Sequence, residues 1–260
     1  MSRLRFKLYS TLNTAKYSIF YDPNIQIRIR RDSKLKHFIK TILMPILMLR
    51  NYFMVDGFIK REIGRLIKKH IKSNTIFLDI GCGNMSLRQF LPKSVCYNAF
   101  DIELSEFHLE RILSEEKGIN VVLCSATRIP LDSNTVSLIA STEVFDHISD
   151  IDKAVIEIYR VLKPGGILTL SISNNYCYKY QKKGPHPEHV NSWTFDEFKE
   201  YMKRLGFKNL EGYMMGYWIP LPLWFTKKSY QLPFSSKEEF YNTNFFFVFQ
   251  KQNNLKYFYY

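Results

Sequence analysis

The sequence predicts a doubly wound α/β domain: a mostly parallel seven-stranded sheet with helices on both faces and an antiparallel edge strand. From Thr75 onward, short apolar runs of strand length alternate with amphipathic runs of helix length. The first apolar run ends in a glycine turn, "FLDIGCGNMS", which can bring backbone close to a ligand. The alternation favours parallel strands, because each helix returns the chain to the starting edge of the sheet.

A change of charge near residue 74 divides the chain. Residues 1–74 carry 17 of the 37 Lys and Arg residues and 4 of the 24 acids, which accounts for the whole net charge of +13. We therefore predict a basic, aromatic and helical extension or cap over 1–74 and the α/β domain over 75–260. Insertions in this domain, forming substrate loops, are expected at about 174–193 and 219–240.

Each predicted strand is a short apolar run bounded by turn residues. No helix as clear as the others separates the last two, so one of them is expected to run antiparallel at the edge. The strands are placed at 75–80, 94–101, 119–125, 135–142, 167–173, 211–218 and 244–251.

The predicted helices between these strands lie at 85–91, 105–116, 149–163 and 195–205. Ser149 with Asp152, and Thr194 with Glu197, have the spacing of a capping box at a helix start. The pair Gly165–Gly166 after Pro164 is expected to end the third helix.

The glycine turn favours a ligand with a positive group over a dinucleotide. Gly81 and Gly83 start the dinucleotide pattern G-x-G-x-x-G, but Ser86 stands where the third glycine belongs. Asp79, at the end of the first strand, would repel a pyrophosphate and suits an amino group. Asp101 ends the second strand, where an acid can accept hydrogen bonds from a ribose diol. A nucleoside with a cationic group fits both acids.

Four segments in this order resemble the successive motifs of class I, Rossmann-like S-adenosylmethionine-dependent methyltransferases, with the small-molecule type 11 group as the best match. They are "LDIGCGNMS", "AFDIE", "CSATRIPLDSNTVSLIASTEVFDHI" and "RVLKPGGILTLSIS", and the resemblance covers roughly residues 75–208. It implies a transferase that uses S-adenosyl-L-methionine for methylation.

The resemblance also implies roles for single residues in cofactor binding. Asp79 would lie near the methionine amino group, with Gly81, Cys82 and Gly83 lining that moiety. Ser141 and the two residues after it would lie under the sulfonium. Met85 departs from the family pattern, because it replaces a small residue of the first motif.

The adenosine half of the cofactor is assigned in the same way. Asp101 would take the ribose hydroxyls, Ile102 would pack on the adenine, and Ser125 with Ala126 would face the adenine. Ser125 is the second departure, since the family often has an acid there, but a hydroxyl still accepts a hydrogen bond from the adenine amino group.

Three histidines are candidate general bases for the transfer: His147, His186 and His189. The alternatives are packing against the next helix for His147 and a surface loop for the other two. The stretch "HVNSWTFDEFKEYMKRLGF" resembles glycan- and lipid-associated family members, which favours a small-molecule, glycan or lipid-like acceptor methylated at oxygen. The absence of an N/D-P-P-Y/F motif and of a Pro-Cys pair disfavours base and glutamine methylation.

Residues 1–74 leave three hypotheses open. From Val55 onward, apolar residues mark one helix face with cations opposite, so the segment can cap the cofactor site. It can also contact an anionic membrane peripherally. Nucleic-acid binding is disfavoured, because no RNA-binding signature is present. The apolar face comprises Phe58, Ile59, Ile63, Leu66, Ile67 and Ile71.

Cysteine usage and hydropathy predict a cytoplasmic protein, with contact at the membrane surface as the alternative. The four cysteines have no CxxC pair and no metal-ligand spacing, so we expect no metal site and reduced thiols. No signal-peptide pattern is seen, and the best membrane-spanning candidate has a charge-free core only at 41–49, against about 20 residues needed.

Two other functions remain open at this point. A catalytically silent methyltransferase-fold scaffold, associated with membrane or RNA, is compatible with the departures at Met85 and Ser125. An NAD(P)-dependent oxidoreductase is disfavoured by the missing third glycine.

Overall fold

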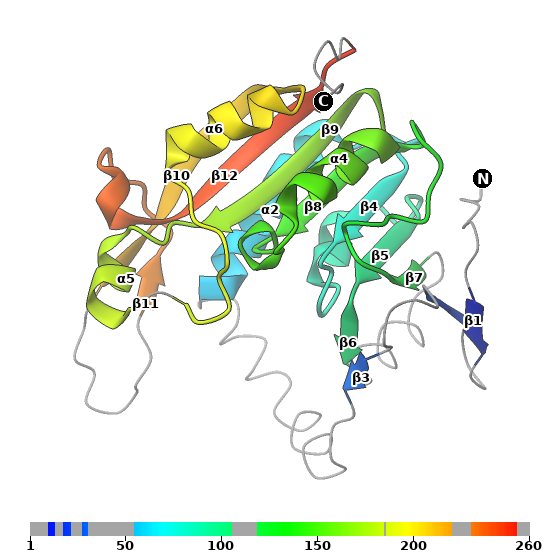
Figure 1. The fold of residues 1–260 in the computed structure, drawn as a ribbon, viewed down its shortest axis with the longest axis horizontal. Helices are drawn as coiled ribbons and strands as arrows, with labels where there is room; N and C mark the ends of the chain where they lie inside the picture. Colours follow the sequence, from blue (N-terminus) through cyan, green and yellow to red (C-terminus); the bar gives the residue numbers. More distant parts are fainter. Residues whose placement is uncertain are drawn as a thin grey trace.

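The computed structural model describes residues 10–13, 18–21, 28–30, 55–105, 119–184, 186–219 and 230–253 (Figure 1). Ten strands form one sheet in the order β1-β2-β7-β5-β4-β8-β9-β12-β10-β11, and β3 and β6 form a second, two-stranded sheet. The seven strands predicted from the sequence are neighbours in this sheet, in the order β7-β5-β4-β8-β9-β12-β10. The predicted fold class is confirmed.

Five neighbouring strands of the large sheet are parallel. Their order, β7-β5-β4-β8-β9, reverses between β4 and β8, because the chain adds strands first on one side of β4 and then on the other. Their bounds are β4 Phe77–Ile80, β5 Tyr97–Asp101, β7 Ile119–Leu123, β8 Val136–Thr142 and β9 Leu162–Ser173.

The other end of the sheet contains the antiparallel strands. β12 (Asn242–Lys251) pairs antiparallel with both β9 and β10 (Phe207–Ile219), so it lies between them, one place inside the expected edge. β11 (Tyr230–Leu232) then pairs antiparallel with β10 at the edge of the sheet.

The described residues before residue 55 are strands, which corrects the expectation of a wholly helical extension. β1 (Ser10–Asn13) pairs with β2 (Ser18–Tyr21), and β2 adds to the sheet beside β7. β3 (Arg28–Arg30) pairs with β6 (Glu103–Ser105). The membrane-spanning candidate at 41–49 lies outside the described residues. Among those described, no helix has the length and apolar content to cross a bilayer.

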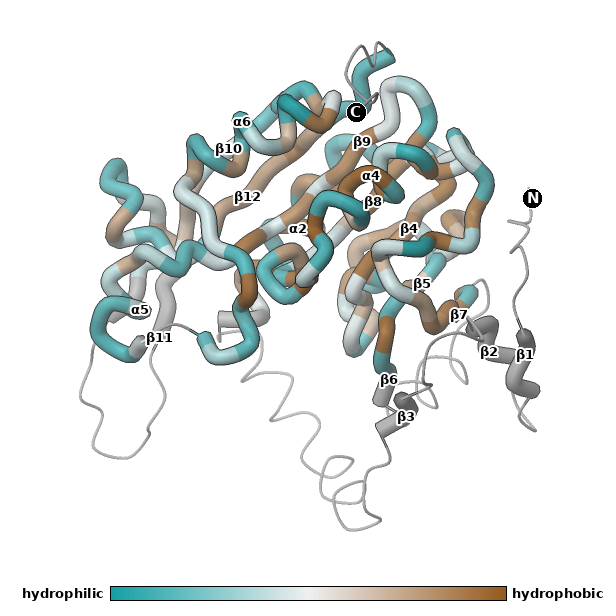
Figure 2. Tube along the Cα trace, in the orientation of Figure 1, coloured by the Kyte–Doolittle hydropathy of each residue, from teal (hydrophilic) through white to brown (hydrophobic). Residues whose placement is uncertain are grey.

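Alternation along the strands creates two apolar layers, one on each face of the sheet. Leu78 and Ile80 of β4 belong to the layer beneath α4 (Ile151–Val161) and α6 (Phe195–Arg204). Phe77, the residue before Leu78, belongs to the layer on the opposite face, beneath α2 (Val55–His70). Figure 2 shows the apolar residues concentrated along the central strands. Helices on both faces therefore follow from strands that are apolar on both sides.

The predicted apolar face of α2 is confirmed. Phe58, Ile59, Ile63, Leu66 and Ile67 are all buried in the second layer, and Ile71 packs against it. A basic segment before residue 74 thus covers one face of the sheet, while its cations remain on the other side of the helix.

Several local predictions need correction. Residues 85–91 form a short 3₁₀ helix, Ser86–Phe90, because Met85 takes a left-handed backbone with φ of 54°. The third predicted helix starts at Ile151, since Asp150 and not Ser149 accepts the Lys153 N–H, at 3.3 Å. Residue 153 is a lysine, so no capping box forms at this helix.

The end of that helix also differs. β9 begins at Leu162, so Pro164 and the two glycines lie in a strand irregularity and not in a turn after the helix. The capping box of Thr194 and Glu197 is confirmed at the start of α6. Residues 106–116 of the second predicted helix lie outside the described residues. The expected insertions contain α5 (Tyr178–Lys183) and the 3₁₀ helix η3 (Glu239–Tyr241).

Gly64 allows α2 to approach the 3₁₀ helix η1 (Ser86–Phe90). A Cβ built on Gly64 would lie 2.4 Å from the Phe90 Cγ atom. We expect Gly64→Ala to lower the free energy of unfolding by about 1–3 kcal/mol, as overpacking does. In a Phe90→Ala background the same change should raise it, by about 1 kcal/mol, because alanine favours helix. Urea denaturation of the parent, the two single variants and the double variant checks this. An equal effect of Gly64→Ala in both backgrounds would contradict it.

Candidate functional site

Two adjoining cavities open at the carboxyl ends of β4, β5 and β8. The larger has a volume of about 520 Å³ and the smaller of about 270 Å³. Gly81, Thr142 and Glu143 line both cavities. The site lies where the strand order reverses between β4 and β8 (Figure 1), which is the usual ligand position in a doubly wound sheet.

The larger cavity gathers the residues assigned to adenosine. Asp101, Ile102, Ser125 and Ala126 all line it. Ile102 is 61% exposed, so its apolar side chain is available to a planar ring. Ser125 Oγ accepts from Thr127 N at 3.2 Å and lies 2.8 Å from Thr127 Oγ1, so one lone pair is left for a ligand when Ser125 donates to the Thr127 hydroxyl.

The smaller cavity gathers the residues assigned to the methionine moiety. Asp79, Cys82 and Gly83 line it together with Gly81. Two residues of α2, Ile59 and Lys60, complete one wall. Lys60 Nζ donates to Asn84 Oδ1 at 3.2 Å, which connects α2 to the glycine turn.

The glycine turn requires its glycines for a steric reason. Gly81 has a φ of 71°, and a Cβ there would lie 2.2 Å from Val144 Cγ2. The turn is held to the second strand, since Gly81 N donates to Phe100 O at 2.8 Å and Gly83 N donates to Asp101 Oδ2 at 2.8 Å. Asp101 therefore fixes the turn and also faces the larger cavity.

Asp79 is a buried carboxyl at the wall of the smaller cavity. It is 1% exposed, and the Tyr97 hydroxyl donates a hydrogen bond to its Oδ2. Burial raises the pKa of Asp79 to about 7, although the Tyr97 hydrogen bond acts in the opposite direction. A cationic ligand group beside it would favour the ionised form.

Of the three residues predicted to lie under the sulfonium, Thr142 and Glu143 line both cavities and Ser141 does not. Ser141 is fully buried and lines neither cavity, whereas Glu143 lines both. Glu143 Oε2 accepts from Ser173 Oγ at 2.6 Å and from Asn244 Nδ2 at 2.9 Å. Its Oε1 has no partner among the described residues. Burial, with Asp146 nearby, raises the pKa of Glu143 to about 7.

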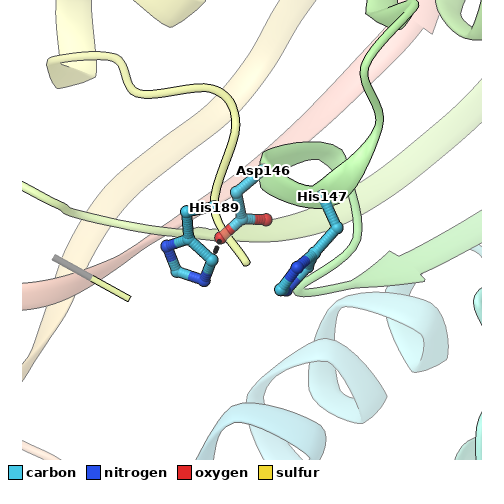
Figure 3. Close-up of side chains that lie close together, drawn as sticks. All are labelled: Asp146, His147 and His189. Atoms are coloured by element: carbon cyan, nitrogen blue, oxygen red, sulfur yellow. Dashed lines mark ion pairs between the residues drawn. The ribbon is translucent and has the colours of Figure 1, made fainter. Parts of the chain in front are cut away.

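The three candidate histidines form one cluster beside the larger cavity. His147 lines this cavity, and the other two do not. The rings of His147 and His189 are 4.7 Å apart between centroids, and those of His186 and His189 are 4.6 Å apart. Asp146 lies against the cluster, with its Oδ2 atom 3.4 Å from His189 Nε2 (Figure 3).

Glu143 was expected only as the last of the three residues under the sulfonium, and Asp146 was not expected at the site. Both lie in "STEVFDHI", directly after the fourth predicted strand, where acids are exceptional beside buried apolar residues. Their position after the strand was the sequence feature that could have identified them as site residues. Glu143 also has a φ of 54°, a conformation that is uncommon outside glycine and frequent at functional sites.

Asp79 is expected to make stability fall as pH rises through the acidic range. An unfolded Asp loses its proton near pH 4, whereas folded Asp79 keeps it to about pH 7, so the folded state loses relative stability between these values. Asp79→Asn cannot titrate, and its amide oxygen still accepts the Tyr97 hydroxyl. We expect its free energy of unfolding to fall less than that of the parent between these values. The exposed Asp196→Asn is the control, and parallel profiles for parent and Asp79→Asn would contradict the prediction.

Comparison with known proteins agrees with this geometry. A family model described as "Methyltransferase domain", of type 11, matches residues 78–170. The mouse protein "Arginine-hydroxylase NDUFAF5, mitochondrial" is 23% identical over 172 residues, 60% of this chain and 50% of that protein. A Mycolicibacterium smegmatis protein named "Probable S-adenosylmethionine-dependent methyltransferase" is 23% identical over 132 residues, 50% of this chain and 51% of its own length.

A solved structure shows the same fold. The SAM-dependent methyltransferase from Thermotoga maritima superposes with a TM-score of 0.54 at 17% identity, covering 80% of this chain and 96% of that one. The chain spans about half the length of the curated relatives described above. With the two cavities and the glycine turn between them, these matches show the Rossmann-like fold of SAM-dependent methyltransferases, with residues 78–170 matching the type 11 methyltransferase domain, and they imply S-adenosyl-L-methionine as the cofactor.

Proposed function

We propose that this protein is an active methyltransferase that moves the methyl group of S-adenosylmethionine to an oxygen atom of a small-molecule, glycan or lipid-like acceptor. The observation that carries the proposal is the junction of the two cavities. Glu143 lines both of them, and the larger one reaches His147 of the histidine cluster. A transferable methyl group and a proton acceptor can therefore meet at one place.

The cofactor fits the two cavities in one orientation. Its adenosine half matches the larger cavity, where Asp101 and Ile102 stand, and its amino acid half matches the smaller one beside Asp79. The sulfonium then falls near the residues shared by both. Asp79 is buried and Glu143 is half-buried there, so the cofactor's two positive groups would be placed beside two carboxyls.

The histidine cluster supports oxygen as the acceptor atom. A hydroxyl must lose its proton during transfer, whereas a neutral amine can attack without a base. His147 Nδ1 lies 3.1 Å from Glu188 O, a carbonyl that only accepts, so Nδ1 carries the proton and Nε2 is left as an acceptor. Methyl transfer is an in-line displacement in which positioning supplies much of the rate, and this base would complete it.

Aromatic residues on and around α5 support a glycan or lipid-like acceptor. The Tyr180 ring of α5 lies 6.1 Å from the His189 ring between centroids, Tyr176 is 47% exposed and Phe240 is 41% exposed. The Tyr178 ring contacts Phe240 at 5.7 Å between centroids, and Lys182 Nζ lies 5.6 Å from the Tyr178 ring centroid. Exposed aromatic rings with adjacent cations suit the faces of sugars and the interface of lipids.

The two departures from the family pattern leave both cavities in place. Met85 is buried in the layer under α2, and Ser125 lines the larger cavity. This favours the enzyme over a silent scaffold. The arginine hydroxylation named for the mouse relative is not part of the proposal, because the match covers only half of that protein.

Cofactor binding is the first test of the proposed function. In calorimetric titrations we expect the full chain to bind S-adenosylmethionine and S-adenosylhomocysteine but not NADH. Asp101→Ala should weaken both by roughly tenfold to hundredfold, since a hydrogen bond to a charged group contributes about 1.5–3 kcal/mol. Glu200→Ala, an exposed acid on α6, is the matched control. If neither adenosyl ligand binds to the parent chain, the proposal is contradicted and the catalytically silent scaffold is favoured.

Transfer itself can be followed with the labelled methyl group of S-adenosylmethionine. The acceptor panel should contain phenols, sugars, hydroxylated lipids and primary amines of similar size. We expect label in base-stable ethers, and His147→Ala should lower kcat while the cofactor dissociation constant changes little. His70→Ala on α2 is the control. Label that appears only in the amines would overturn the choice of oxygen.

A further inference from the structure

Asp146, His147 and His189 bring three potential metal ligands together beside the larger cavity. Asp146 and His147 belong to the short helix η2 (Phe145–His147), which directly follows β8, and His189 comes from the loop between α5 and α6. One ligand atom from each residue lies within 4.8 Å of the other two. Figure 3 shows the Asp146 carboxylate beside the His189 ring, with His147 on the same short turn as Asp146.

The Asp146 carboxylate is buried and only partly satisfied. Its side chain is 1% exposed, and Oδ2 accepts from the Ser173 N–H at 3.3 Å. Its Oδ1 has no hydrogen-bond partner among the described residues. Because an unpaired buried carboxylate is costly, this oxygen indicates that a cation or proton belongs beside it.

The loop that carries His189 is fixed to η2. Val190 N and Asn191 N both donate to the backbone oxygen of Asp146, at 2.8 Å and 3.2 Å. Asn191 Nδ2 also donates to Phe145 O at 3.1 Å and to Ile148 O at 2.7 Å. The position of His189 opposite Asp146 is therefore set by the backbone.

Neighbouring groups determine which ring nitrogen of His189 is free. The Asn175 amide donates to Asn191 O at 3.2 Å and to Ser192 Oγ at 2.8 Å, so its Oδ1 faces His189 Nδ1, at 2.7 Å. His189 Nδ1 must then carry the proton, and Nε2 presents a lone pair to Asp146 Oδ2.

His147 has the same arrangement, since its Nδ1 is held by Glu188 O. Hydrogen bonding at one ring nitrogen that leaves the other as a lone pair is the usual outer environment of metal-binding histidines. His189 Nε2 and Asp146 Oδ2 are 3.4 Å apart, and two acceptors face each other there unless a positive species lies between them.

We propose that Asp146, His147 and His189 bind a divalent transition-metal ion of the zinc, cobalt or iron(II) kind. Two imidazoles with one carboxylate suit these ions better than magnesium or calcium, which prefer oxygen ligands. Bond lengths of about 2.0–2.2 Å allow two ligand atoms of one ion to be at most roughly 4.4 Å apart. The three side chains need only a small closure from their present separation.

No sequence motif indicated this site, because the expectation of no metal rested on cysteine spacing. His147 lines the larger cavity, so an ion held by this cluster would adjoin it. With the ion bound, His147 Nε2 would be a ligand and would no longer serve as the base. The ion, as a Lewis acid, would take over this role by lowering the pKa of a bound acceptor hydroxyl, whose proton would pass to solvent. The new C–O bond then replaces the C–S bond, and S-adenosylhomocysteine leaves. This last role rests on the proposed function, whereas ion binding does not.

The test uses the full chain without a histidine tag, stripped with a chelator and titrated with Co²⁺ in the absence of cofactor. We expect one ion per chain and visible absorption bands of nitrogen and oxygen coordination. A strong thiolate charge-transfer band would instead place the ion at the exposed Cys96 and overturn the assignment. His189→Ala and Asp146→Asn should each weaken binding by more than tenfold.

Control variants separate the ligands from their surroundings. His70→Ala on α2 and His186→Ala, whose Nδ1 accepts from Glu188 N at 3.3 Å, should keep the affinity of the parent. Asn175→Leu keeps His189 but removes the acceptor at its Nδ1, and we expect roughly tenfold weaker binding as for other outer-environment changes. This variant preserves the test if Asp146→Asn fails to fold.

Two results would overturn the proposal: no stoichiometric ion in the parent chain, or an affinity that His189→Ala leaves unchanged. Calorimetry with S-adenosylmethionine on the same samples keeps the two hypotheses distinct. Loss of cofactor binding with intact ion binding counts against the methyltransferase activity alone, and the reverse result counts against the metal site alone.

Discussion

The need to bury both faces of the central sheet governs most of this structure. Each parallel strand alternates between the layer under α2 and the layer under α4 and α6, so polar residues have little room along its length. Polar groups therefore gather where the strands end, at Asp101 of β5 and in the residues after β8. Asp79 is a buried acid one residue before the end of β4, and Tyr97 from the neighbouring strand supplies its hydrogen bond.

Three carboxyls lie in or next to the site: Asp79 and Glu143 line the cavities, and Asp146 lies against the histidine cluster. Burial alone would hold such groups neutral, since a desolvated charge without a partner is costly. Positive ligand groups change this balance, because each can stabilise the ionised form of a nearby acid. The site therefore selects for positive charge at more than one point, which agrees with a sulfonium cofactor and with an ion in the histidine cluster.

Local patterns were sufficient to predict the seven strands along the chain, the glycine turn, the apolar face of α2 and the Thr194 cap, because each depends on near neighbours in sequence. They failed where two near-equivalent residues compete, as Ser149 and Asp150 do at the start of α4. The family resemblance placed Ser141 and the two residues after it under the sulfonium, and strand alternation turns the Ser141 side chain into the core. The meeting of His147 with His189 depends on a loop held by backbone hydrogen bonds, which no sequence spacing reports.

The position of β12 has a consequence for how the chain reaches its folded state. β12 follows every other strand of the sheet in sequence, yet it lies between β9 and β10 and buries Phe245, Phe247 and Phe249 on one face and Phe246 on the other. Until this segment arrives, β9 has only β8 and β10 has only β11 as a partner, so each presents an open edge late in synthesis. Exposed apolar edges of this kind favour aggregation over folding until β12 pairs with both strands.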